Sequence, residues 1–234
     1  MTLYGGGVTN LASAAPAMTP TEYGVGARFT LSVYDSDYVR IILDALASVN
    51  AANLTVETND ISTCVTGSEA DIAAYLRDVI SAAAASGVHL SAAIMLSRGC
   101  PGELVCSLPP GVRALGAAPV SLAATGIRAR AHWSVYPLLD AAAAHVTGPA
   151  DSSSGSGSSA TFPSDHMAPI YAAIERAKAT GVYSGSDHFA TRLDGDLADV
   201  LETVTNAWIE VGAVVQHVVT HLTVSINSPT HITD

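Results

Sequence analysis

The sequence predicts an α+β fold, a tandem repeat of two ferredoxin-like units that each have the element order βαββαβ and an antiparallel sheet. The first observation is an internal match. Residues 36–101 align with residues 164–229 at a constant offset of 128, and 13 of these 66 positions are identical. The second is the apolar spacing, which alternates between the strand and helix periods in the same order in both copies. Together they indicate a duplication of one unit.

In the first copy, strand segments alternate apolar and polar side chains, whereas helix segments repeat apolar side chains every three or four residues. Ser68, with Asp71 three residues later, is a suitable N-cap for the second helix. The expected elements are a strand at 28–34, a helix at 36–49, a hairpin of 54–57 and 61–66, a helix between Ser68 and Gly87, and a strand at 89–97.

The second copy repeats each of these elements. Asp196 is the expected N-cap of its second helix, and apolar spacing places Phe189 and Trp208 in the core. The expected elements are a strand at 130–136, a helix ending at Thr180-Gly181, a hairpin of 182–184 and 189–193, a helix after Asp196, and a strand at 218–226.

Composition shifts divide the chain into five parts. Regions rich in Gly, Ala, Pro or Ser without apolar spacing are expected outside the two units, and the Ser/Gly-rich insertion at about 138–162 is expected to be mobile. The predicted parts are a flexible N-terminal extension at 1–26, repeat one at 27–101, a connection at 102–127, repeat two at 128–229, and a tail at 230–234.

Charge and cysteine content narrow the class of protein. The formal net charge is −11 and Lys178 is the single lysine, which disfavours binding to nucleic acid. The three cysteines form no CxxC pair, so we expect a reducing compartment. Neither a secretory signal nor an apolar run long enough to span a membrane is present. The expected protein is cytoplasmic and does not insert into membranes.

A polar corner occurs in the hairpin of each copy, and no nucleophile signature, P-loop or dinucleotide fingerprint accompanies it. Short polar side chains suit either a turn or a binding site, and their duplication favours binding. Tyr34 and Tyr136 fall on the strand face opposite the core, where a planar heterocycle could stack on them. The corner residues are Asn59, Asp60, Ser62 and Thr63 in the first copy, and Asp187, His188 and Thr191 in the second.

An alternative prediction from another class is a metal-dependent hydrolase. His217 and His221 share one strand face, and His188 with Asp187 could approach them to hold zinc. The Asp194-Gly195-Asp196 segment is a weak metal loop, because no series of spaced oxygen ligands follows it. A small-molecule sensor is a third possibility, since fold alone does not separate these functions.

Several segments together resemble the YkoF family of thiamine- and hydroxymethylpyrimidine-binding proteins, over about residues 26–229 apart from the insertion. They are the two hairpins, His217 and the strand that contains it, Gly99-Cys100-Pro101-Gly102, Val135-Tyr136-Pro137, Leu193-Asp194-Gly195-Asp196 and Asn227-Ser228-Pro229. The resemblance implies a non-catalytic homodimer of tandem ferredoxin-like repeats. It also implies one site per repeat for thiamine or its pyrimidine half, a role in uptake or salvage of the precursor with a possible transporter partner, and no further cofactor or metal.

The resemblance also implies which residues form the sites. Repeat one departs from the family pattern, with Ser32-Val33 where Tyr-Pro is expected and Asp60 where a histidine is usual. We therefore expect the second repeat to hold the better site. The implied ligand-binding residues are Ser32, Tyr34, Asn59, Asp60, Ser62 and Thr63 in repeat one, and Tyr136, Asp187, His188 and Thr191 in repeat two.

Overall fold

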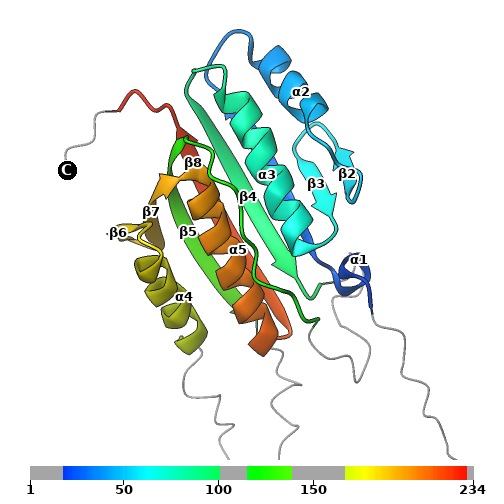
Figure 1. The fold of residues 1–234 in the computed structure, drawn as a ribbon, viewed down its shortest axis with the longest axis vertical. Helices are drawn as coiled ribbons and strands as arrows, with labels where there is room; N and C mark the ends of the chain where they lie inside the picture. The colour runs from blue at the N-terminus through cyan, green and yellow to red at the C-terminus, as the bar shows by residue number, and fades with distance from the viewer. Residues whose placement is uncertain (1–17, 101–114, 139–166, 231–234) are drawn as a thin grey trace, which may run out of the picture.

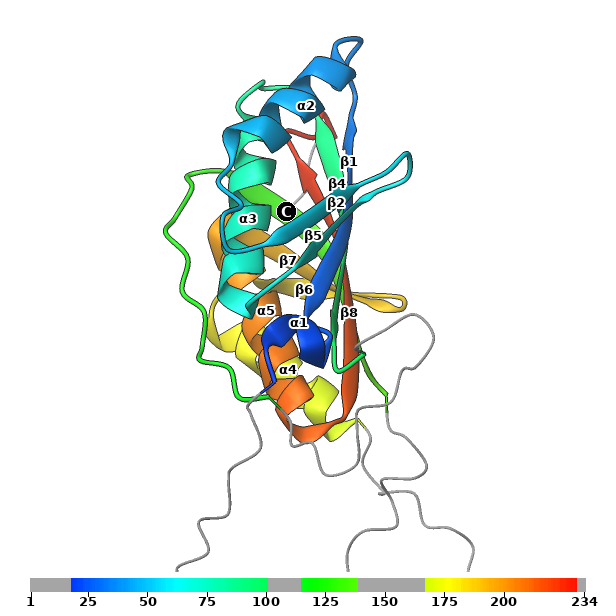
Figure 2. The same cartoon turned by 90° about the vertical axis from the view of Figure 1, so that its right-hand side faces the viewer.

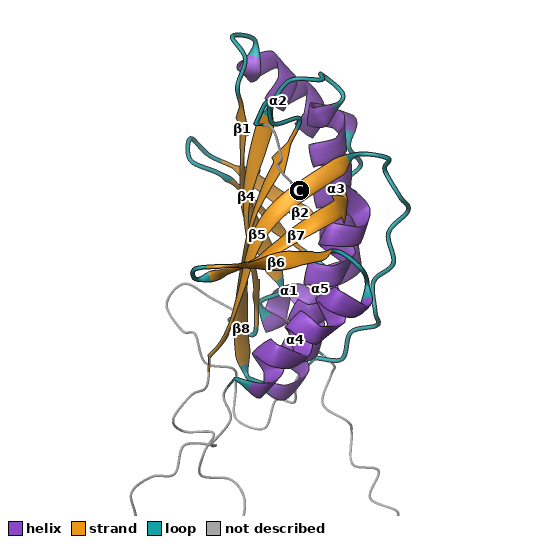
Figure 3. Cartoon of the chain, turned by 90° about the vertical axis from the view of Figure 1, so that its left-hand side faces the viewer, coloured by secondary structure: helices purple, strands orange, loops and turns teal. Residues whose placement is uncertain are grey.

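The computed structural model describes residues 18–100, 115–138 and 167–230, and their strands form a single eight-stranded sheet. Every strand pairing is antiparallel. The helices cover one face of the sheet and leave the other face open, and the tips of two hairpins project on the open side (Figures 2 and 3). No helix among the described residues is long and apolar enough to cross a membrane.

Repeat one has the predicted βαββαβ order (Figure 1). Ser68 caps the second helix as expected, because its hydroxyl accepts a hydrogen bond from the backbone N–H of Asp71 at 3.1 Å. The elements are β1 (Gly26–Val33), α2 (Tyr38–Ser48), β2 (Thr55–Thr58), β3 (Thr63–Thr66), α3 (Glu69–Ala84) and β4 (Leu90–Arg98).

Repeat two has the same order, so the predicted tandem of ferredoxin-like units is confirmed. The strand order across the sheet is β2-β3-β1-β4-β8-β5-β7-β6, in which each repeat contributes four neighbouring strands. The elements are β5 (Arg128–Leu138), α4 (Ala168–Ala179), β6 (Tyr183–Asp187), β7 (Ala190–Asp196), α5 (Leu197–Val214) and β8 (His217–Ile226).

The two repeats join through their last strands, β4 and β8. Ile94 lies opposite Leu222 in this pairing, and these residues are equivalent at the offset of 128. An antiparallel pairing of equivalent strands centred on equivalent residues relates the repeats by a local two-fold axis. Because β4 and β8 cover each other's edges, only β2 and β6 are edge strands of the described sheet.

Regular secondary structure occurs within the segment that was predicted to be a flexible N-terminal extension. Residues 20–26 were expected in a flexible extension, but α1 (Pro20–Tyr23) is a short helix with a complete capping box at Thr19. Tyr23 and Val25 are buried in the core, which is what holds this segment in place. Residues 1–17, the insertion beyond Leu138 and the last four residues lie outside the described part of the chain.

The described half of the connection, residues 115–127, follows α5 and is bound to it by side chains. Asn206 accepts a hydrogen bond from the N–H of Val120 at 2.7 Å and donates one to its carbonyl at 2.9 Å. Glu202 accepts a hydrogen bond from the N–H of Leu122 at 2.8 Å. Residues 115–127 thus gain backbone hydrogen bonds from side chains of α5 and form neither a strand nor a helix.

Asp196 also binds the connection through several hydrogen bonds, and it caps α5 as predicted. Its carboxylate accepts hydrogen bonds from Thr125, from the N–H of Gly126 at 2.6 Å and from the N–H of Ala198 at 2.8 Å. Burial acts to raise the pKa of Asp196, but the hydrogen bonds outweigh it, so the pKa lies below the ordinary value of 3.8.

Replacing Asp196 with alanine is expected to lower the free energy of unfolding by about 1–2 kcal/mol at pH 7, because a helix cap and the connection's anchor are lost together. The pKa of Asp196 is lower in the folded protein than in the unfolded chain. Its contribution to the free energy of unfolding is therefore fully present well above pH 3.8 and is lost as the pH falls through the folded-state pKa. Urea unfolding at pH 7 and pH 3 checks both points. A difference between the two proteins that does not shrink at pH 3 would contradict the account.

A buried arginine links the two repeats on the helix side of the sheet. Arg98 is 1% exposed at the end of β4, and its Nε donates a hydrogen bond to Glu69 at 2.8 Å. Its other nitrogens donate to the carbonyls of Gly212, at 2.8 Å, and Leu115. Its guanidinium also lies 5.0 Å from the ring centre of Tyr23. Arg98 therefore contacts α1, α3, α5 and the connection.

The carbonyl of Gly212 lies in the last turn of α5, where helical carbonyls lack intrahelical partners. The equivalent carbonyl in repeat one, that of Ala84, accepts a hydrogen bond from Asn227 at 3.3 Å. Each repeat thus caps the other's second helix from the end of its last strand. The positions equivalent to Glu69 and Arg98 hold apolar residues in repeat two, Leu197 and Ile226.

Candidate functional site

The second repeat has a cavity where two of its strands stop pairing. β5 pairs with β7 only between Arg128 and Trp133, although β5 continues to Leu138. Beyond Trp133, this edge of β5, the β6–β7 hairpin and α4 border an open cavity of about 300 Å³. Residues that line it include Trp133, Tyr136, Ile170, Asp187, Phe189 and Thr191. Three of the four residues predicted for the second site, Tyr136, Asp187 and Thr191, therefore lie together.

Aromatic side chains form much of the cavity wall. Tyr136 is 51% exposed, and the indole of Trp133 is buried and donates a hydrogen bond to Thr220 at 2.7 Å. Ile170 and Ile174 of α4 add aliphatic surface. Such a wall suits the flat face of a small heterocycle, as stacking and apolar burial both favour it.

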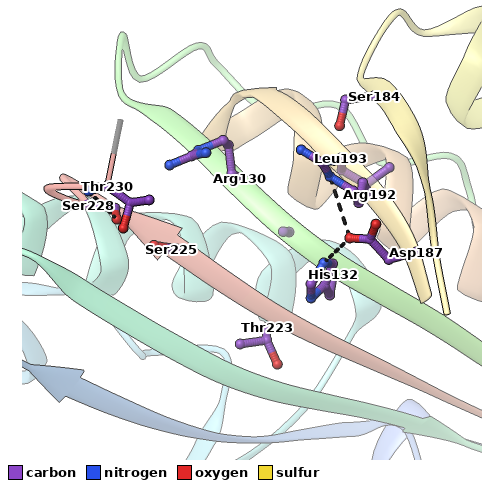
Figure 4. A pocket seen from close by; sticks show the side chains of 11 residues that line it. Arg130, His132, Ser184, Asp187, Arg192, Leu193, Thr223, Ser225, Ser228 and Thr230 are labelled. Carbon is purple, nitrogen blue, oxygen red and sulfur yellow. Dashed lines mark hydrogen bonds and ion pairs between the residues drawn. The ribbon is translucent and has the colours of Figure 1, made fainter. Parts of the chain in front are cut away.

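Asp187 supplies the negative charge at the cavity. Its Oδ2 lies 2.8 Å from Nε2 of His132 and 3.6 Å from Nε of Arg192, both on the open face of the sheet (Figure 4). The Asp187 side chain is 45% exposed, so these surface contacts contribute little to stability. The carboxylate thus keeps accessible oxygen atoms for a ligand that donates hydrogen bonds.

Phe189 was expected in the core, and this prediction is wrong because its side chain is 97% exposed. It occupies the tip of the β6–β7 hairpin with φ at 69°, a left-handed conformation that costs a bulky residue energy. The hydroxyl of Ser134 donates a hydrogen bond to the Phe189 carbonyl at 2.9 Å and fixes the tip beside the cavity. Phe189 lies outside the strand, because β7 begins at Ala190, one residue later than predicted.

The family model described as "YKOF-related Family" matches residues 24–103 and 160–231. The chain belongs to this family. A Bacillus subtilis (strain 168) protein named "Putative HMP/thiamine-binding protein YkoF" is 26% identical over 208 residues, which are 87% of this chain and 90% of that protein. The matched segments of the YKOF-related family contain both hairpins and all helices from α2 to α5.

The first repeat of this YKOF-related chain holds its hairpin tip in the same way. Thr30 donates a hydrogen bond to the Ile61 carbonyl at 3.1 Å, as Ser134 does to the carbonyl of Phe189. Strand register makes these pairs equivalent, and it also places Ser32 where repeat two has Tyr136. The backbone of the site is thus duplicated, and Phe29 occupies the position of Trp133, but serine and isoleucine replace Tyr136 and Phe189.

The polar corner of repeat one serves mainly the hairpin itself. Asn59 accepts hydrogen bonds from the backbone N–H groups of Ile61 and Ser62, both at 2.9 Å, which is the turn-forming role. The hydroxyls of Ser62 and Thr63 bond to Arg28 and Thr58, respectively, at 3.0 Å. These groups are therefore less available to a ligand than Asp187 is.

The two remaining residues predicted for repeat one lie apart from each other. Asp60 is exposed at the hairpin. Tyr34 stacks on His89 with ring centres 4.5 Å apart, and its hydroxyl lies 3.5 Å from that of Ser91 on β4. Since β4 and β3 flank opposite edges of β1, Tyr34 is turned away from the hairpin. The structure does not bring the six predicted residues of repeat one into one group.

The histidines proposed as a metal site do not come together. Nε2 of His217 lies 3.1 Å from the hydroxyl of Ser97, and His221 is exposed on the open face. His188 lies at the hairpin tip, its ring centre 6.1 Å from that of Phe189. Within the described ranges, no three His, Cys, Asp or Glu side chains form a group that could hold a metal ion. The specific cluster behind the hydrolase hypothesis is therefore absent from this part of the chain.

Proposed function

We propose that this protein binds hydroxymethylpyrimidine, free or as the pyrimidine half of thiamine, and that the cavity of the second repeat is its principal site. The observation that carries the proposal is the grouping of Tyr136, Phe189 and Asp187 around one cavity of about 300 Å³. The name of the Bacillus subtilis relative points to the same ligand class.

The chemistry of an aminopyrimidine matches this cavity. Its flat ring can stack between the aromatic side chains of Tyr136 and Phe189. Its exocyclic amine donates hydrogen bonds, which the Asp187 carboxylate accepts, and its ring nitrogens accept them from hydroxyls such as that of Thr191. In thiamine, the adjacent thiazolium cation is further favoured by the negative charge of Asp187.

The first repeat is proposed as a second, weaker site. It keeps the free strand edge and the anchored hairpin tip but has Ser32 in place of the Tyr136 ring and Ile61 in place of Phe189. Its Asn59 is neutral and already bonded to backbone N–H groups. A pyrimidine there would lose both stacking and the charged acceptor.

The family resemblance supports the wider role that we propose. The protein would act without catalysis, metal or further cofactor, as a homodimer in uptake or salvage of the vitamin precursor, and a transport system would be its partner. Light scattering coupled to gel filtration tests the dimer, for which a mass near twice 23.8 kDa is expected.

Calorimetric titration of the full chain with hydroxymethylpyrimidine, thiamine and thiamine pyrophosphate tests the binding function. We expect saturable heat with hydroxymethylpyrimidine and thiamine, with one tighter and one weaker site. Uracil, a pyrimidine without the exocyclic amine, is the matched control and should give none. The absence of heat and of any thermal shift with all three ligands would refute the proposal.

Replacing Phe189 with glycine is expected to separate stability from binding. Glycine adopts φ of 69° without strain, so the free energy of unfolding should not fall and should rise by up to about 1 kcal/mol. Ligand affinity should fall about tenfold, because a stacking surface is lost. Thermal unfolding and calorimetry measure the two effects.

The matched control is Ile61→Gly, at the equivalent tip where φ is not positive. This change should lower stability slightly, through the added freedom of the unfolded chain, and leave binding at the principal site intact. If Phe189→Gly bound ligand normally, the aromatic wall would have no part in binding.

A further inference from the structure

A second cavity, of about 360 Å³, lies on the open face of repeat two. Its lining includes side chains from β5, β7 and β8 and from the segment after β8 (Figure 4). Asp187 borders both this cavity and the proposed pyrimidine site. The residues that define its chemistry are Arg130, His132, Arg192, Ser225, Ser228 and Thr230.

Positive charge is concentrated around this cavity in an otherwise acidic chain of net charge −11. Arg130 lies opposite Asp194 in the register, and Arg192 lies two residues before Asp194, so the two arginines are diagonal neighbours on adjacent strands. Hydrogen bonding from Arg128 is the largest of the effects that lower the pKa of Asp194, and the charges of Arg130 and Arg192 act in the same direction. This places three guanidinium groups near one carboxylate.

The guanidinium of Arg130 is not neutralised by a close partner. Arg128 makes two hydrogen bonds of 2.8 Å to the Asp194 carboxylate. Arg130, by contrast, has no carboxylate oxygen within 4.0 Å among the described residues. Arg192 has only a 3.6 Å contact with Asp187, whose nearer partner is His132. The cavity therefore retains net positive charge even with His132 neutral.

Hydroxyl groups line the side of the cavity formed by β8 and the residues after it. Ser225 on β8 and then Ser228 and Thr230 border it. Arginine guanidinium groups with hydroxyl donors are the usual partners of phosphate oxygens in proteins. Carboxylate ligands would use the same arginines, but the additional donors match the larger number of acceptor atoms on a phosphate.

The duplication provides an internal comparison for this cavity. The positions equivalent to Arg130 and Arg192 in repeat one are Gly26 and Cys64, as the strand register and the offset of 128 show. Neither residue can bind an anion through a cationic side chain. The charged cavity is thus specific to repeat two and is not a consequence of the shared fold.

We propose that this open-face cavity of repeat two is a phosphate-binding site, which takes inorganic phosphate or the phosphate group of a small monoester. Arg130 and Arg192 bind the phosphate oxygens, and the hydroxyls of Ser225 and Ser228 complete the site. The proposal is independent of pyrimidine binding, because hydroxymethylpyrimidine has no phosphate and its cavity is bordered by α4, which does not line the open-face cavity.

Titration with inorganic phosphate and with phenyl phosphate, at constant ionic strength set by sodium chloride, tests this proposal by calorimetry and ³¹P NMR. Saturable binding is expected for at least one of these two compounds. The ratio of their affinities shows whether a phosphate ester is preferred to inorganic phosphate. Arg130→Gln is expected to weaken binding at least about tenfold, as one charge-assisted contact is lost. Asp194→Asn should tighten it, because a competing negative charge is removed.

Arg28→Gln is the matched control, since Arg28 lies on the open face of repeat one at the position equivalent to His132. It should change phosphate affinity less than twofold. Arg192→Gln gives a second test if Arg130→Gln folds poorly, which thermal unfolding reveals. The proposal is overturned if neither phosphate compound binds saturably, or if Arg28→Gln weakens binding as much as Arg130→Gln does.

Discussion

Replacing Arg98 with leucine is expected to lower the free energy of unfolding by about 3–5 kcal/mol, because it leaves Glu69 charged and buried without its partner. Glu69 is 5% exposed, and its bond from Arg98 is 2.8 Å long. The substitution also removes the donors to the carbonyls of Gly212 and Leu115. Urea unfolding monitored by circular dichroism measures the loss.

Repeat two itself provides the control for this prediction. Its residues at the equivalent positions are Leu197 and Ile226, so the double variant Glu69→Leu, Arg98→Ile recreates an apolar pair that this fold already contains. The double variant should recover more than half of the stability lost in Arg98→Leu. A double variant less stable than the single one would show that the buried charges are not what makes the single variant unstable.

Replacing Asp187 with alanine is expected to weaken binding of hydroxymethylpyrimidine about 10- to 100-fold, because the charged acceptor for its amine is removed. The melting temperature should change little, since the contacts of this half-exposed carboxylate with His132 and Arg192 lie at the surface. Calorimetry and thermal unfolding of the same sample measure both quantities.

Asn59→Ala is the control at the equivalent position of repeat one. There the side chain accepts two backbone hydrogen bonds, so we expect lower stability and unchanged affinity at the principal site. If Asp187→Ala unfolded the protein while Asn59→Ala did not, the roles assigned to the two corners would be reversed.

The secondary structure and the duplication could be predicted from the sequence because they depend on local patterns. Apolar alternation located β1 and β5, and the side chains of Ser68 and Asp196 marked the starts of α3 and α5. The offset of 128 residues relates the starts of β2 and β6 and of α3 and α5, whereas α2 and α4 begin 130 residues apart. The apolar spacing and the caps lie within windows of a few residues, and the duplication is found by comparing the sequence with itself, so none of them needs knowledge of the tertiary structure.

Other features depended on contacts between distant residues. The connection near Val120 has no apolar period, because Asn206 and Glu202 on α5 bind it through side chains. Arg98 gives no local sign of burial, since its partners come from both repeats. Phe189 appeared to continue a strand, but the hairpin turn places it at the tip.

The candidate site was predictable in its residue types but not in its boundaries. Tyr136, Asp187 and Thr191 were expected to act together and do line one cavity. The register of β5 against β7, which opens the edge beyond Trp133, could not be predicted from either strand alone. In repeat one, β1 and the β2–β3 hairpin have the same arrangement, but Asn59 forms hydrogen bonds within the hairpin and is not available to a ligand as Asp187 is.

A crystal structure of the full chain grown with saturating hydroxymethylpyrimidine tests the central claim most directly. We predict electron density for the pyrimidine ring between Tyr136 and Phe189, with its exocyclic amine within hydrogen-bonding distance of the Asp187 carboxylate. An empty cavity at this position, or an ordered ligand bound only elsewhere on the protein, would contradict the account.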